Sequence, residues 1–410
     1  MRSRSASWER IAKRGQFNFQ AKATINGTDY FAITAPRISR ALLSKPAEVG
    51  NCNAATLSVS VRTENEIPSG YPIVIKGRVV DQTGTASEWL EFGTFYIDQR
   101  NDEYKGLIEF SCYDAMLKCN QAYPLSRASD TWPKSMSAVV SDIASLLGIA
   151  VDPRTTINTG SAYVVPQPTD LNVMQVLGYI GACHGGNWII TEENKLRLVP
   201  LVSAPEESYY IVDTDYDRII TDDDQFLISE QWEHASAGNS ALNAMPSRLS
   251  AVLGSLHTAA AITVTGIHGE DGSGNTYFVG DQTGYVLNLG KNPYLSQAII
   301  NDLLTRYQGL TYVPFKAESA IFDPAMELGD QIMLGSVIGS MVASLDLTLD
   351  IAFRANLSAP NDTKLQSEYP YASEMQLMEQ RLASLARSLQ STVSTLTELN
   401  SRVGQLESRT

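Results

Sequence analysis

The C-terminal stretch from Met375 to Thr410 carries the most restrictive pattern in the sequence. Apolar residues recur there alternately three and four positions apart, which is the a/d pattern of a coiled coil. A helix packed on a globular core would show a broader apolar stripe with a period of 3.6 residues. The pattern therefore predicts that copies of the chain associate through a coiled coil at residues 373–410. The seam consists of Met375, Met378, Leu382, Leu385, Leu389, Thr392, Leu396, Leu399, Val403 and Leu406.

The residues of the seam favour three copies over two. Ile and Val, which favour dimers at the a positions, are nearly absent, and no a position carries Asn. Small or apolar residues such as Ala386 and Val393 flank the seam, so that the buried surface can widen beyond two helices. We expect a parallel homotrimer with a helix about 54 Å long. A helix that folds back on its own domain is the alternative.

Composition places the rest of the chain among large globular proteins. The chain has 410 residues, 43% of them hydrophobic, which is enough for two or three domains. No apolar run is long enough to span a membrane, and no apolar stretch follows the basic N-terminus as it would in a secretory signal. The net charge of -14 argues against a surface that grips nucleic acid, although not against nucleic acid that passes by.

The cysteines and histidines show no metal-binding pattern. Cys52, Cys112, Cys119 and Cys183 lack CxxC spacing, so we expect reduced thiols and neither a zinc site nor another cofactor. The stretch from Asp213 to Asp224 resembles a calcium loop only in part, because Arg218 stands where that loop needs Gly and Asp224 replaces its final Glu. We therefore expect solvated carboxylates there and no metal.

The N-terminal third is strand-rich. Residues 1–15 are basic and are expected to form a loose arm, with docking on an acidic neighbouring subunit as the alternative. Residues 16–122 alternate apolar and polar positions, and Asn26-Gly27 predicts a type I′ hairpin turn after Phe17–Ile25. The remaining expected strands lie at residues 57–61, 73–80, 92–97 and 107–113. Antiparallel strands without intervening helices favour a small barrel or a sandwich.

Residues 123–205 are predicted to form a small helix-helix-hairpin unit. One apolar helix face runs from Met136 to Leu147 and ends at Gly148, and a second helix after Thr169-Asp170 ends at Gly185-Gly186. Two strands follow, at residues 187–191 and 195–199.

Residues 206–357 return to strands, with one helix expected from Tyr294 to about Tyr307. The alternation from Met341 to Ala355 predicts one long strand with one buried and one solvated face. A polar linker, residues 358–372, precedes the coiled coil.

The order of these parts, and four stretches within them, resemble the baseplate hub or tail-tip hub proteins of long-tailed phages and related contractile injection systems. The stretches are CYDAMLK at residues 112–118, VLGYIGACHGGNWIITEENKLRL at 176–198, GYVLNLGKNPYLSQ at 284–297 and DPAMELGDQI at 323–332. The resemblance covers roughly residues 16–357.

The resemblance implies an α+β, β-rich fold with two antiparallel β-barrel domains flanking the helix-helix-hairpin unit. It also implies a trimeric ring at the distal end of the tail, which adapts a sixfold tube to a threefold tip and leaves a passage for DNA or cargo. The expected partners are the tail tube or distal tail protein and a spike, tail-tip or fibre protein, with assembly in the host cytoplasm. Many members of that family continue into a peptidase or fibre-like region, whereas this sequence ends after its coiled coil.

No catalytic group stands out in the sequence. Cys183 and His184 are adjacent at a helix end, where neighbouring side chains do not point at each other, and no GxSxG elbow accompanies the glycines that follow. We expect a non-enzymatic structural protein of the virion. A receptor-binding tail fibre or adhesin and a tail-associated cell-wall peptidase are the alternatives.

Overall fold

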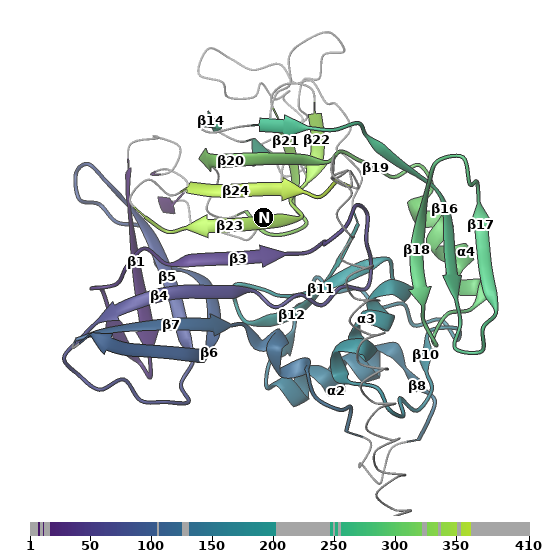
Figure 1. Ribbon diagram of the computed structural model, residues 1–410, viewed down its shortest axis with the longest axis horizontal. Helices are drawn as coiled ribbons and strands as arrows, with labels where there is room; N and C mark the ends of the chain where they lie inside the picture. The colour runs from purple at the N-terminus through teal and green to yellow at the C-terminus, as the bar shows by residue number, and fades with distance from the viewer. Residues whose placement is uncertain are drawn as a thin grey trace, which may run out of the picture. The chain divides into compact units, whose positions relative to one another are not determined.

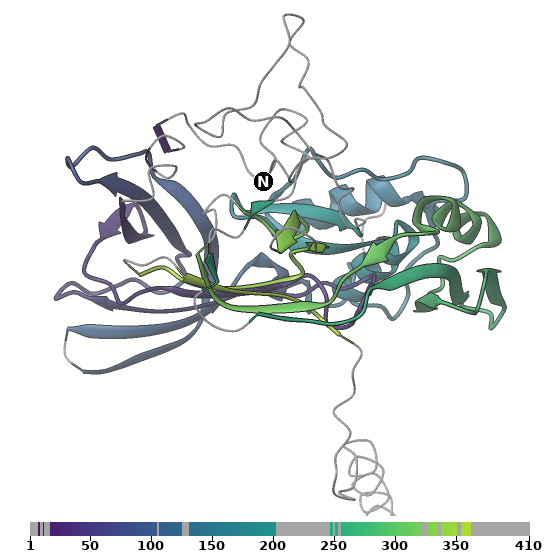
Figure 2. The same cartoon turned by 90° about the horizontal axis from the view of Figure 1, so that it is seen from above.

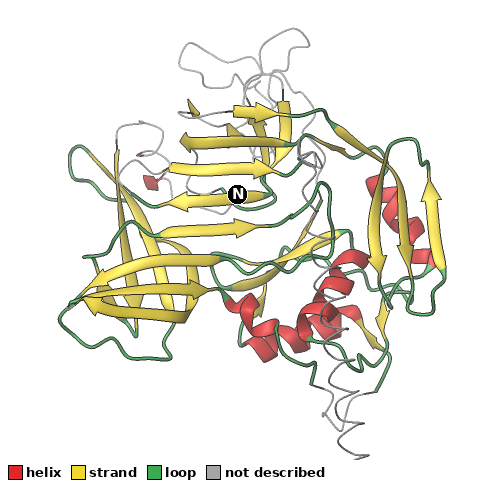
Figure 3. Cartoon of the chain, viewed as in Figure 1, coloured by secondary structure: helices red, strands yellow, loops and turns green. Residues whose placement is uncertain are grey.

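Strands dominate the part of the chain that the structure describes. The computed structural model describes residues 7–8, 11, 17–104, 106–124, 131–201, 247–248, 251–252, 256–321, 326–334, 338–350 and 354–361. Its secondary structure is mostly β, with three α-helices of eleven or twelve residues in that part of the chain (Figure 1, Figure 3). The expected β-rich, α+β class is therefore confirmed. The predicted coiled coil lies outside the described residues.

The first strand-rich region begins with the predicted hairpin. Strands β1 (Phe17–Ile25) and β2 (Thr28–Tyr30) pair across Asn26 and Gly27, which both have positive φ angles of 48° and 75°, as a type I′ turn requires. The other strands of the region are β3 (Arg37–Ala41), β4 (Thr56–Arg62), β5 (Ile73–Asp81), β6 (Leu90–Tyr104) and β7 (Leu107–Tyr113), followed by a short 3-10 helix η1 (Ala115–Cys119). All the strands expected for this region are present.

The helix-helix-hairpin unit also has the predicted order of elements. Ser135 caps the first helix and Gly148 ends it in the left-handed conformation, whereas Asn172 and Gln175 form a capping box at the start of the second. The elements of this unit are β8 (Lys134–Ser135), α2 (Met136–Leu147), β9 (Ala150–Val151), β10 (Val164–Val165), α3 (Val173–Cys183), β11 (Gly186–Ile190) and β12 (Lys195–Pro200).

The second strand-rich region is divided among several sheets. Strands β16, β17, β18 and β19 form a four-stranded sheet, which carries α4, and β13, β21 and β22 form a three-stranded one. The elements are β13 (Ser247–Arg248), β14 (Ala251–Val252), β15 (Leu256–Thr258), β16 (Ile262–Glu270), β17 (Thr276–Gly280), β18 (Tyr285–Lys291), α4 (Gln297–Tyr307), β19 (Thr311–Tyr312), β20 (Phe315–Ile321), β21 (Gln331–Leu334), β22 (Ile338–Met341), β23 (Ser344–Thr348) and β24 (Arg354–Ala359).

The prediction of one long strand from Met341 to Ala355 is wrong. The segment belongs to three strands, and β23 and β24 pair antiparallel with each other, with Thr348 opposite Arg354. The apolar-polar alternation continues on both sides of the turn, so the period of two residues does not reveal where the chain reverses.

Strands of both strand-rich regions join in one sheet. This 12-stranded sheet has the order β14-β20-β24-β23-β3-β4-β7-β6-β5-β1-β2, with β15 paired to β20. The two regions meet where β3 pairs antiparallel with β23, from Ser344 opposite Ala41 to Thr348 opposite Arg37. Two separate closed barrels are not found among the described strands, because strands assigned to different barrels share this ladder.

The first region nevertheless curls back on itself. The segment after β2 makes an isolated antiparallel bridge between Ile33 and Val61 of β4, and the amide N–H of Thr34 donates to the carbonyl of Ser60 at 2.9 Å. One isolated bridge is not a continuous ladder, so this curl is not a closed barrel. Figure 2 shows the curled strands at one end of the shared sheet.

Alternation along the shared strands buries one face of the sheet and leaves the other polar. On β3, Ile38 and Arg40 are buried whereas Arg37 and Ser39 are exposed, and β4, β23 and β24 follow the same pattern. A shallow hollow of about 510 Å³ lies on the polar face. Its polar lining residues include Arg37, Ser39, Thr56, Ser58, Ser111, Tyr113, Asp346, Thr348 and Asn356.

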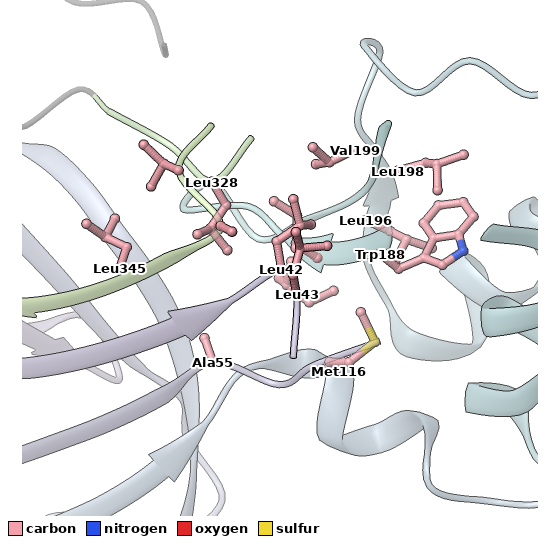
Figure 4. Packing of buried hydrophobic residues seen from close by; sticks show 14 of the residues in the cluster. Leu42, Leu43, Ala55, Met116, Trp188, Leu196, Leu198, Val199, Leu328 and Leu345 are labelled. Atoms are coloured by element: carbon pink, nitrogen blue, oxygen red, sulfur yellow. The ribbon is translucent and has the colours of Figure 1, made fainter. Parts of the chain in front are cut away.

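The hydrophobic core is continuous where the two strand-rich regions and the helix-helix-hairpin unit meet. Figure 4 shows Leu42 and Leu43 after β3, Met116 from η1, Trp188 from β11 and Leu328 before β21 gathered at this point. All five are buried. Full burial of one large apolar side chain stabilises the folded state by about 1.5–3 kcal/mol. These side chains together therefore form a strong attachment between segments far apart in sequence.

Two described residues of the expected N-terminal arm also lie in the core. Trp8 is 0% exposed and Ile11 is 1% exposed. The basic character of residues 1–15 predicted a loose segment, but the apolar side chains within it provide enough surface to pack.

Candidate functional site

The residues predicted from the sequence to carry oligomerisation are not placed by the structure. The seam from Met375 to Leu406 lies outside the described residues, as does the acidic stretch from Asp213 to Asp224. No group of His, Cys, Asp and Glu side chains suited to a metal ion occurs in the part of the chain that the structure describes. No helix among the described residues is long and apolar enough to cross a membrane.

Cys183 and His184 do not form a nucleophile–base pair. The thiol of Cys183 is fully buried, accepts a hydrogen bond from Asn292 Nδ2 at 3.5 Å, and has its pKa raised to about 12 by burial. The His184 ring makes its hydrogen bonds to Ile180 and Asn158 instead. None of the four cysteines is in a disulfide.

The polar groups that the fold does bring together lie where its three parts meet. The most buried of them is the pair of Arg40 on β3 and Glu192 in the β11–β12 turn, whose Nη1 and Oε1 atoms are 2.7 Å apart. Arg40 Nη2 also donates to the carbonyl oxygen of Phe92 at 2.6 Å. Both charged side chains are less than 10% exposed. The first strand-rich region is therefore bound to the hairpin through a dry, charge-assisted contact.

A second ionic cluster binds the helix-helix-hairpin unit to the second strand-rich region. Arg154 donates to both carboxylate oxygens of Glu327, at 2.7 and 3.2 Å, and to both of Asp152, at 2.8 and 2.9 Å. Arg197 approaches Glu327 at 3.5 Å. The side chain of Arg154 is 40% exposed, whereas those of Glu327 and Asp152 are 3% exposed. This cluster is thus open to water on its arginine side only.

The charges of this cluster stabilise each other's ionised forms. Hydrogen bonds from Arg154 hold the pKa of Asp152 below its usual value, against the effect of burial. The same bonds raise the pKa of Arg154, so that its guanidinium stays charged.

Helix α4 docks on the helix-helix-hairpin unit through polar contacts at the end of α3. Tyr163 donates to Asp302 Oδ2 at 2.5 Å, and Arg306 Nη1 donates to the carbonyl oxygen of His184 at 3.1 Å. Tyr307 lies directly against Gly185, where a Cβ atom would come within 2.1 Å of the tyrosine ring. Gly185 has a φ of 67°, so both its conformation and this close approach require glycine.

None of these partners was predicted from the sequence. Arg154 and Glu327 are 173 positions apart, and Arg40 and Glu192 are 152 positions apart, so no local spacing indicates that they meet. Only one signal was available in the sequence. Arg40 stands where the apolar-polar alternation predicts a buried side chain, and Glu192 stands where a tight turn is predicted.

The four stretches that carry the resemblance to hub proteins meet at this junction. Met116 comes from the first stretch, Trp188 and Glu192 from the second, Asn292 from the third and Glu327 from the fourth. Asn292 Nδ2 donates to the carbonyl oxygen of Tyr179 at 2.9 Å, which joins the second and third stretches directly. Residues of these stretches thus take part in the contacts between the parts of the fold.

Comparisons with known proteins give structural neighbours only. No family model matches the chain, and no curated protein matches it. Three similar solved structures are described as tail proteins, two of them from prophages. The 43 kDa tail protein of prophage MuSo2 from Shewanella oneidensis has a TM-score of 0.47 and 11% sequence identity, and the match covers 83% of this chain and 98% of that chain. A tail protein from Neisseria meningitidis MC58 has a TM-score of 0.46 and 9% identity, and the match covers 84% of this chain and 97% of that chain. Prophage tail protein gp18 from Listeria monocytogenes EGD-e has a TM-score of 0.44 and 10% identity, and the match covers 90% of this chain and 99% of that chain. At these TM-scores the similarity does not assign a role to this chain.

Proposed function

We propose that this chain is a non-enzymatic structural hub at the distal end of a phage tail or of a tail-like injection device. It works as a homotrimeric ring between the tail tube and a spike, tail-tip or fibre protein. DNA or cargo passes through the ring during ejection, and the protein takes its place in the virion after assembly in the host cytoplasm.

The observation that carries the proposal is the position of the four hub-like stretches. They are spread over more than 200 residues of sequence, yet they contribute contacts that join the two strand-rich regions to the helix-helix-hairpin unit. A structural hub needs this property, because it transmits force between a tube and a tip without its parts coming apart.

The polar face of the shared sheet supports the passage. Its outward side chains are mainly Ser, Thr and Asn, with charges of both signs such as Arg37 and Asp346. A basic wall would retain DNA, since affinity grows with each phosphate that is neutralised. We assign the wall of the passage to this face, because hydroxyl groups bind a passing polyanion only weakly.

The predicted coiled coil supplies the threefold symmetry. Replacing Leu389, at the centre of the seam, with Asp would bury three carboxylates together at a cost of several kcal/mol and should open the bundle. Light scattering on the purified chain is expected to give three copies per particle, and fewer after Leu389→Asp. A wild-type chain that is monomeric at micromolar concentration would contradict the trimer.

The match of a sixfold tube to a threefold tip requires two comparable modules in each copy. The described strands of the two regions do not share one strand order, since the first forms a single curled run and the second is divided among three sheets. The adaptor part of the proposal therefore needs a test of its own. Image averages of the trimer from electron microscopy should show six similar densities on the face that contacts the tube. Three densities on both faces would contradict the adaptor role, but not the trimer.

Immunogold electron microscopy of intact particles tests the hub against its alternatives. An antibody to the chain is expected to label the tail end where the tube meets the tip. Label along fibres, together with binding of the purified protein to host envelopes, would favour a receptor-binding fibre. A clearing zone in a cell-wall zymogram, lost on changing Cys183 or His184, would favour a peptidase.

A further inference from the structure

The ring of His184 joins two segments of the chain through its two nitrogen atoms. Nδ1 lies 2.8 Å from the carbonyl oxygen of Ile180 in α3, and Nε2 lies 2.9 Å from the backbone nitrogen of Asn158. A carbonyl oxygen only accepts a hydrogen bond and a backbone N–H only donates one. The ring must therefore carry its proton on Nδ1 and offer a lone pair on Nε2, which makes it neutral.

The surroundings of the His184 ring disfavour the binding of a second proton. His184 is 2% exposed and its ring centre lies 5.0 Å from that of Tyr163. Helix α4 contributes the cation of Arg306, the carboxylate of Asp302 and the hydroxyl of Tyr307. His184 and Arg154 both line a hollow of about 390 Å³. Cys183, the neighbour of His184 in sequence, is a protonated thiol.

We propose that His184 is a pH-dependent latch, which in its neutral form holds residues 152–163 against the end of α3 and on protonation releases them. A protonated ring carries hydrogen on both nitrogens, so Nε2–H would face the N–H of Asn158, donor against donor. That hydrogen bond must break. Asp302 offers little compensation, because its Oδ2 atom already accepts from Tyr163 and from Asn158 Nδ2.

The released segment carries contacts to the second strand-rich region. Arg154 bonds to Glu327, and Asn158 and Tyr163 bond to Asp302 of α4. Protonation of His184 would therefore weaken the attachment of that region to the helix-helix-hairpin unit. The first strand-rich region, which is attached through Arg40 and Glu192, would not be affected.

The direction of the pH dependence follows from burial. Burial lowers the pKa of His184 from its usual 6.5, and the nearby charge of Arg306 acts in the same direction. The hydrogen bond to Ile180 and the charge of Asp302 oppose this effect without reversing it. The unfolded or released state thus binds the proton more readily than the latched state. The latch is fully stable above pH 6.5 and loses stability as the pH falls below that value.

Hydrogen exchange tests the latch in the full-length chain, with rates corrected for the intrinsic effect of pH on amide exchange. Between about pH 7.5 and about pH 5, peptides covering residues 154–160 are expected to lose protection, by roughly tenfold for each unit by which the ring's pKa is lowered. In the variant His184→Gln, whose amide oxygen can still accept from Asn158 but does not titrate, protection is expected to be independent of pH. The matched control His257→Gln changes an exposed histidine on β15 and should keep the wild-type response.

A measurement on the unmodified chain guards against a variant that does not fold. In protein labelled at histidine with ¹³C, the ring signal of His184 should titrate below the range of the exposed histidines, with a midpoint that coincides with the loss of protection at residues 154–160. The proposal is overturned if protection in this segment does not change with pH, if it changes equally in His184→Gln, or if the ring titrates at the usual value.

Discussion

The two strand-rich regions are attached to the rest of the molecule in different ways. Strands β1 to β7 of the first region all belong to the shared sheet, and this region is bound to the hairpin by the buried pair of Arg40 and Glu192. The second region places only part of its strands in that sheet and is attached by the Glu327 cluster and by α4. The side chains of Arg154 and Arg306 in those contacts are 40% and 42% exposed.

The difference indicates where solution conditions can act. A dry ion pair is screened little by salt, but it leaves an uncompensated buried charge if one partner is lost. Half-exposed pairs cost less to break and respond to salt and pH. We therefore expect the first attachment to be the stronger and the second to be the adjustable one.

The largest effect is expected from Glu192→Ala. The change leaves the guanidinium of Arg40 buried without its carboxylate, and should lower the free energy of unfolding by about 3–5 kcal/mol. Urea unfolding followed by circular dichroism measures the loss. The control is Glu193→Ala at the next position, where the carboxylate is 56% exposed and pairs with Lys195, so the change should be close to zero. Equal losses in both variants would show that the buried pair has no special role.

Glu327→Gln should have a smaller effect. The variant keeps the shape of the side chain but loses the charge that faces Arg154 and Arg197, at a cost of about 1–3 kcal/mol. Because one side of the cluster is open to water, the loss should shrink as salt is added, whereas that of Glu192→Ala should not. Unfolding in low and in high salt distinguishes the two, and an equal salt response would remove the contrast between the attachments.

A pH dependence opposite in direction to that of His184 is expected from Asp114 in the first region. Its carboxylate caps η1 and accepts from the backbone N–H groups of Ala55 and Met116, and burial raises its pKa to about 7. The folded state then binds a proton more readily than the unfolded state between about pH 4 and about pH 7, so that stability from this group falls as the pH rises through that range. Thermal unfolding of Asp114→Asn should show a smaller fall over this range than the wild type; an unchanged slope would rule out Asp114 as its source.

The smallest effect is expected from Asp152→Asn in the helix-helix-hairpin unit, where Asp152 pairs with Arg154 of the Glu327 cluster. The pKa of Asp152 is lowered, so its stabilising contribution is present above the usual value of 3.8 and is lost as the pH falls through the folded pKa. Melting temperatures of this variant and the wild type should differ at neutral pH and converge in acid. A difference that persists in acid would mean that the packing of Asp152, and not its charge, is what matters.

Local patterns predicted the elements better than they predicted their assembly. The alternation around Asn26-Gly27 indicated the first hairpin, and the apolar face from Met136 to Leu147 indicated α2, because both signals lie within a few residues. The same alternation hid the turn between β23 and β24. Pairing of β3 with β23 could not be predicted, since Ser39 and Asp346 on facing strands are 307 positions apart.

The junction residues escaped prediction for a related reason. A charged residue such as Arg40 or Glu327 looks like a surface residue until its partner is known, and the partner lies in another part of the chain. The four hub-like stretches carried the resemblance, but they did not indicate that their residues would meet.

The two strand-rich regions share one sheet through the pairing of β3 with β23. Native-state hydrogen exchange over a series of urea concentrations tests this directly. Amides of residues 37–41 and of residues 344–348 should open with the same free energy and the same dependence on urea, because their hydrogen bonds belong to one ladder. Loss of protection in residues 344–348 and 354–359 at urea concentrations where residues 37–41 and 56–62 stay protected would show two independent domains, and would contradict one cooperative shared sheet.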